Sequence, residues 1–196
     1  MKTKSTPHFL AIIVHPTRTF IEIFKEQSGL KHIVPLLLLG SIGQVCYRFW
    51  DIKNETYLFS SFLTSSFLAL LVGWIGFVIF SWILHYSCKF LGGSASLDKS
   101  ITIVAWSLVP SIAGLLFFLL YITVVDVSFL NSIGDLGLTT VKTIIVTIRS
   151  VLGLTSLFIL IGGISSAYKL TFFKSFLALI FPILLFLTLT FFLTLI

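Results

Sequence analysis

Five strongly apolar stretches, poor in charged residues, dominate this chain. They cover residues 33–50, 58–88, 101–125, 150–168 and 175–196. Most of them match the roughly 20 apolar residues that a helix needs to cross about 30 Å of hydrocarbon. Charged residues make up only 10% of the chain and the mean hydropathy is +1.11, whereas a soluble domain carries about 25% charged residues. The sequence therefore predicts an all-α integral membrane protein, a bundle of five transmembrane helices.

The predicted domain organisation has two parts. Residues 1–30 form a cytoplasmic amino-terminal segment and residues 31–196 form the five-span domain. A short amphipathic helix is expected from Pro16 to Gly29, because proline suits a first helical turn and glycine a stop. Its apolar side holds Phe20, Ile21, Ile23 and Phe24, and its polar side holds Arg18, Glu22, Lys25 and Glu26. This helix either works in the membrane interface, binding a partner or sensing curvature, or docks on the bundle.

The lysines and arginines concentrate in every second gap between the apolar stretches. Nine of them fall on one side, namely Lys2, Lys4, Arg18, Lys25, Lys31, Lys89, Lys99, Lys169 and Lys174, and four on the other, namely Arg48, Lys53, Lys142 and Arg149. Cytoplasmic loops carry the excess of cations, so the amino terminus is expected in the cytoplasm and the carboxyl terminus outside. The net charge of +6 is thus a topology signal, and we expect no nucleic-acid partner.

Prolines and small residues predict how the helices bend and pack. Pro110 and Pro182 lie inside apolar stretches, where each is expected to kink its helix. Small residues cluster at Gly40, Ser41 and Gly43, at Ala69, Gly73 and Gly76, at Ala113 and Gly114, and at Gly162, Gly163 and Ser166. Such residues let helix backbones approach closely in lipid.

No catalytic or metal-binding pattern stands out. The string Gly92-Gly-Ser-Ala-Ser96 has no obvious base beside it and is read as a turn. The histidines are scattered, and a zinc or haem site needs several ligands brought close together. We therefore predict a protein that is not an enzyme, with no catalytic residues, no cofactor and no metal.

Two polar side chains lie well inside the apolar stretches, Gln44 in the first and His85 in the second. Polar groups are costly in hydrocarbon unless they are paired. Gln44 and His85 therefore either mark a solvated path or form hydrogen bonds with a neighbouring helix or with the lipid headgroups.

A second candidate lies before the fourth span. Polar residues recur there at Thr139, Lys142, Thr143 and Arg149, and on a helix they form one stripe. The stripe either lines an outward vestibule for anions, with Asp126 and Asp135 as counter-charges, or extends the span among lipid phosphates.

Three segments and one proline form a further pattern, namely His15-Pro-Thr-Arg-Thr-Phe20, Leu91-Gly-Gly-Ser94, Ile103-Val-Ala-Trp-Ser-Leu-Val-Pro110 and Pro182. They resemble the bacterial members of the Yip family, five-span membrane proteins related to Ypt/Rab-interacting proteins. The resemblance implies a location in the bacterial inner membrane. Eukaryotic relatives carry an Asp-Leu-Tyr-Gly-Pro string that this chain lacks, so small-GTPase binding is not carried over.

The expected function follows from these features together. We predict a non-enzymatic membrane-organising or adaptor protein that contacts lipids, itself or other membrane proteins. The alternative is a small oligomeric transporter or channel for an ion or small solute, using Gln44, His85, Lys142, Arg149 and Asp126.

Overall fold

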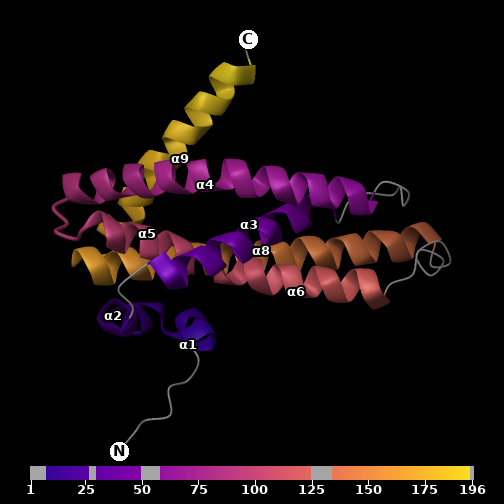
Figure 1. The fold of residues 1–196 in the computed structure, drawn as a ribbon, viewed down its shortest axis with the longest axis horizontal. Helices are drawn as coiled ribbons and strands as arrows, with labels where there is room; N and C mark the ends of the chain where they lie inside the picture. The colour runs from indigo at the N-terminus through magenta and orange to yellow at the C-terminus, as the bar shows by residue number, and fades with distance from the viewer. Residues whose placement is uncertain (1–7, 27–29, 50–57, 125–133, 195–196) are drawn as a thin grey trace, which may run out of the picture. The chain divides into compact units, whose positions relative to one another are not determined.

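The computed structural model describes residues 8–26, 30–49, 58–124 and 134–194. Every regular element in these residues is an α-helix (Figure 1). The helices are α1 (His8–Val14), α2 (Pro16–Glu26), α3 (Leu30–Phe49), α4 (Leu58–Phe90), α5 (Leu97–Trp106), α6 (Val109–Val124), α8 (Gly134–Tyr168) and α9 (Phe172–Thr194). The predicted all-α class is confirmed.

Three helical stretches of the described residues are long and apolar enough to cross a membrane, Leu63–Phe90, Leu97–Phe117 and Thr143–Tyr168. Two shorter apolar stretches, Ile33–Ile42 and Phe172–Leu185, lie within α3 and α9. Each of the five overlaps one apolar stretch of the sequence. The helices are therefore consistent with an all-α membrane bundle, while the number of five crossings stays a prediction.

The third apolar stretch is interrupted, where the sequence predicted a kink. Helix α5 ends at Trp106 and α6 begins at Val109, with a turn at Ser107 and Leu108 between them. Pro110 explains this place, because it has no N–H to donate to the carbonyl of Trp106 and its ring clashes with that carbonyl. In α9, by contrast, Pro182 lies inside a helix that continues to Thr194.

Helix α8 is a single element of 35 residues, so the polar segment before the predicted fourth span is helical. Its threonine hydroxyls bond the preceding turn: Thr143 Oγ1 donates to the carbonyl of Thr139 at 2.9 Å, and Thr147 Oγ1 to that of Thr143 at 2.8 Å. These hydroxyls are thus satisfied by their own helix, as is common for threonine in apolar surroundings.

The chain divides into two compact units. The first contains residues 1–33, 75–107 and 157–196, and the second contains residues 34–74 and 108–156. Within the second unit, a Cβ added at Gly40 would lie 2.6 Å from Leu108 Cβ, and one added at Gly73 would lie 3.3 Å from Ser41 Oγ. Small residues therefore allow close approach there, as expected.

Helix α2 begins at Pro16, as predicted, and the predicted stop at Gly29 lies outside the described residues. Its buried side consists of Thr19, Phe20 and Ile23. Ile21 was expected on this side but is 46% exposed. Successive helical residues rotate by about 100°, which places Ile21 beside Lys25, four positions on, and away from Phe20.

Candidate functional site

The hydroxyl of Tyr168 lies at the centre of a buried polar cluster in the first unit. It forms a hydrogen bond of 2.7 Å with Nδ1 of His85 and a second hydrogen bond with Oγ of Ser100. Tyr168 is the last residue of α8, His85 lies near the end of α4, and Ser100 lies in the first turn of α5. All three side chains are buried. The cluster therefore joins three helices through one phenol oxygen.

The turn after α4 makes room for this tyrosine. Gly92 has φ of +93°, and its N–H bonds the carbonyl of Lys89 at 3.0 Å while that of Gly93 bonds Cys88 at 2.9 Å. This is the pairing of a Schellman cap, in which glycine takes the left-handed position. A Cβ added at Gly93 would lie 2.7 Å from Tyr168 Cδ1. The paired glycines thus end α4 and admit the ring of Tyr168.

The chemistry of the cluster fits a structural contact between helices better than a catalytic site. A phenol hydroxyl donates one hydrogen bond and accepts others, so Tyr168 can satisfy both partners. Polar groups buried between helices cost free energy unless they are bonded in this way. The nearby thiol of Cys88 is buried and free. The described residues hold no group of three or more His, Cys, Asp or Glu suited to a metal ion.

The predicted site residues are distributed as follows. His85 is buried and bonded to a neighbouring helix, one of the two interpretations given for it. Arg149 is exposed on α8, in the other unit. Gln44 and Lys142 lie within α3 and α8, but their side chains fall outside the description, and Asp126 lies outside the described residues altogether.

Sequence reasoning missed Tyr168 and Ser100, and it read Gly93 only as part of a turn. A tyrosine directly before Lys169 at the end of an apolar stretch resembles an ordinary interfacial aromatic. The paired glycines after His85 were the available signal, since they permit close packing at that turn.

A second feature of this unit is the elbow, which we define as helices α1 and α2 with His15 between them. Phe20 and Ile23 are fully buried. A Cβ added at Gly163 would lie 2.7 Å from both Phe20 Cε2 and Ile103 Cγ2, and one at Gly162 would lie 3.0 Å from Pro16 Cβ. The two glycines of α8 thus form a platform on which α2 lies against α5 and α8.

Two ring contacts and a hydrogen bond hold the rest of the elbow. The ring of Phe9 lies 5.5 Å from that of buried Trp106, and the Lys99 ammonium lies 5.5 Å from the centre of the Phe24 ring. Thr19 Oγ1 donates to the carbonyl of His15 at 2.9 Å, where α2 begins. The two ring contacts fix both helices of the elbow to α5, and the hydrogen bond lies within the elbow.

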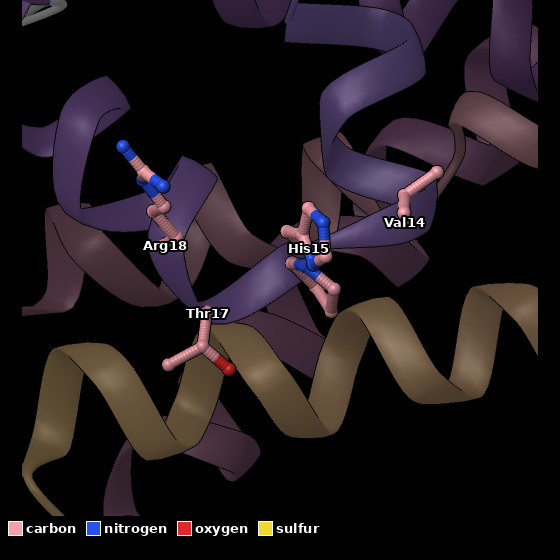
Figure 2. Close-up of a pocket in the computed structure, with 5 residues that line it drawn as sticks. Val14, His15, Thr17 and Arg18 are labelled. Atoms are coloured by element: carbon pink, nitrogen blue, oxygen red, sulfur yellow. The ribbon is translucent and has the colours of Figure 1, made fainter.

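The outer side of the elbow is exposed. Several apolar side chains of α1 are exposed, namely Phe9, Leu10, Ile13 and Val14. Where α1 meets α2, an open depression of about 390 Å³ is lined by residues 14–18. Figure 2 shows Thr17 directed toward the neighbouring helix and the Arg18 guanidinium extending away from it. The elbow therefore presents apolar and cationic groups side by side.

Comparison with known proteins gives one match. The family model of the Yip1 domain matches residues 10–193, nearly the whole chain. No curated protein and no solved structure matches. The family match and the apolar helices agree with the resemblance seen in the sequence, and the chain belongs to the Yip1 domain family as a multi-pass membrane protein.

Proposed function

We propose that this protein is a non-enzymatic membrane organiser or adaptor, which acts by presenting its amino-terminal elbow to lipids and membrane partners. The observation that carries this proposal is the two-sided elbow. One side of α2 is buried on the Gly162-Gly163 platform, while α1 leaves Leu10 and Val14 more than 60% exposed. A segment that only led into the first span would not need such a fitted platform.

The buried cluster supports the same function by keeping that platform in shape. Tyr168 follows Gly163 by five residues on α8 and ties this helix to α4 and α5. The elbow lies on α5 and α8, so the cluster and the elbow share their supporting helices. Transport was the alternative, and the bonding of His85 to Tyr168 favours the contact interpretation for that residue.

The proposal includes an orientation. We infer that the protein lies in a bacterial inner membrane with its amino terminus in the cytoplasm, and the nine cations of one set of segments support this orientation. The elbow then faces the inner leaflet. Single cysteines placed at Phe90 and Phe173, both exposed beside lysines, should react with a membrane-impermeant maleimide only after the cells are opened.

Photocrosslinking tests the adaptor role. A benzophenone side chain at Leu10, which is 66% exposed, should form an adduct with a membrane partner in native membranes, while one at Ile12, which is fully buried, should not. Adding Gly163→Ala should lower the yield of the Leu10 adduct, because α2 then no longer packs on the Gly162-Gly163 platform. Adducts of equal yield from Leu10 and Ile12, or only self-adducts from Leu10, would refute the adaptor role.

A further inference from the structure

The Arg18 guanidinium is an exposed cation of the elbow. Its side chain is 84% exposed, and an ion pair joins its Nε to Oε1 of Glu22 at 3.6 Å. That distance is too long for a hydrogen bond. A guanidinium carries five N–H donors in a planar fork, and such a fork matches the oxygens of a phosphate. Arg18 can therefore offer this fork to an external anion.

The position of the elbow makes that anion a membrane component. The platform residues Gly162, Gly163 and Ile103 all lie inside stretches able to span a membrane. Gly162 precedes the end of α8 at Tyr168 by six residues, which is about 9 Å along a helix. An arginine carried by a helix that packs on such spans is costly in hydrocarbon unless it meets an anion, and lipid phosphates are the anions found near the ends of spans.

The neighbouring surface suits the rest of a lipid. His15 and Val14 line the same open depression as Arg18. From there the exposed apolar side chains of α1 continue along one side of the elbow. An acyl chain can lie on them while its phosphate meets Arg18 and the imidazole of His15. Burying apolar surface adds to such binding at about 25 cal/mol per Å².

The charge of this unit favours an anionic lipid. Exposed cations lie on the elbow and beside the turns at the ends of α4 and α8, namely Arg18, Lys25, Lys89, Lys169 and Lys174. The exposed acidic residues described in the same unit are Glu22 and Asp98. The unit is thus cationic where it is exposed.

We propose that the elbow holds an anionic phospholipid, with its phosphate between Arg18 and His15 and an acyl chain along α1. The inference rests on the proposed function, since it names one partner of the elbow. It assigns binding and no chemical step.

Native mass spectrometry of the full chain in detergent tests this site, with phosphatidylglycerol as the probe. Arg18→Gln should raise the apparent Kd for the lipid about tenfold or more, because a charge-assisted bidentate contact is lost. Lys25→Gln, which removes one exposed cation from the same helix, should change it less than about twofold, as expected for a screened surface charge. Equal effects of the two substitutions would overturn the site.

Two further arms identify the source of the phosphate. Inorganic phosphate in hundredfold excess over the lipid should not displace it, and Val14→Ser should weaken retention of the lipid. Displacement by inorganic phosphate would show a free-anion site and overturn the lipid assignment. Arg18→Lys keeps the charge without the fork, so wild-type retention by both Arg18 variants would also overturn it.

The outcome is separable from that of the adaptor experiment. Lipid retention is measured on purified protein with no partner protein present. A Leu10 adduct without a lipid effect of Arg18 would leave the adaptor role standing and remove only the lipid site. Lipid retention that depends on Arg18, without a partner adduct, would leave the lipid site standing and remove the adaptor role.

Discussion

Gly163→Ala should release the elbow from the bundle. The added Cβ would lie 2.7 Å from Ile103 Cγ2 and 2.7 Å from Phe20 Cε2, whereas carbon atoms are in good contact at about 3.5–4.0 Å. The overlap approaches 1 Å on two sides. Ile103 is buried and β-branched, so it has few other rotamers, and Phe20 has no exposed surface into which to move. The helix α2 itself must therefore shift.

The size of the effect follows from two opposing terms. Overpacking a buried site costs about 1–3 kcal/mol, and replacing glycine by alanine inside a helix returns up to about 1 kcal/mol. The net destabilisation of docking is on the order of 1–2 kcal/mol, which increases the undocked population roughly 5- to 30-fold.

Limited trypsin digestion of the purified protein reads out this population. Cleavage after Arg18 and Lys25 requires α2 to leave the Gly162-Gly163 platform and unfold locally. The cleavage rate should therefore rise with the undocked fraction. Cleavage after the exposed Lys169 in the α8–α9 turn serves as an internal reference, since it should not change.

The same helix provides a graded control series. Gly153 has nothing within 4 Å of an added Cβ, so Gly153→Ala should leave cleavage at the wild-type rate or slow it slightly. Gly162→Ala should fall between the two, because Pro16 Cβ would lie 3.0 Å away. Equal cleavage rates for the Gly163 and Gly153 variants would refute the platform.

Three further outcomes are expected. Tyr168→Phe should lower the free energy of unfolding in detergent by about 1–3 kcal/mol, because His85 and Ser100 lose their common partner. The control Tyr86→Phe, at a 57% exposed position, should change the melting temperature little. Equal shifts in melting temperature for the two variants would contradict the cluster. Gly92→Ala should cost about 1–2 kcal/mol through its left-handed backbone. Gly93→Ala should lower the melting temperature for another reason, because its Cβ would displace the ring of Tyr168. In a Cys46→Ser background, maleimide should label the buried thiol of Cys88 slowly. Tyr168→Ala should accelerate this labelling at least several-fold. An unchanged labelling rate would show that Tyr168 does not cover this turn.

Local patterns in the sequence were enough for the helices and for several contact points. Apolar stretches of spanning length favour helices in any arrangement, because hydrocarbon offers the backbone no other hydrogen-bond partners. The Gly162-Gly163 pair was expected at a close contact and lies under α2. The sequence correctly predicted that Pro110 disturbs its helix. Whether the helix bends or stops there depends on the hydrogen bonds of the turn at Ser107. One of them is a 2.7 Å hydrogen bond from the Ser107 hydroxyl to the carbonyl of Val104.

The identity of each partner came only from the tertiary structure. Tyr168 is separated from His85 by 83 residues and from Ser100 by 68, and neither helical periodicity nor hydropathy relates positions so far apart. The same holds for Phe20 against Gly163. By itself, the sequence determined that this chain forms apolar helices with a cationic amino-terminal segment. Three-dimensional packing decided which polar groups satisfy one another, because a buried hydroxyl can bond only the side chains that neighbouring helices bring within reach.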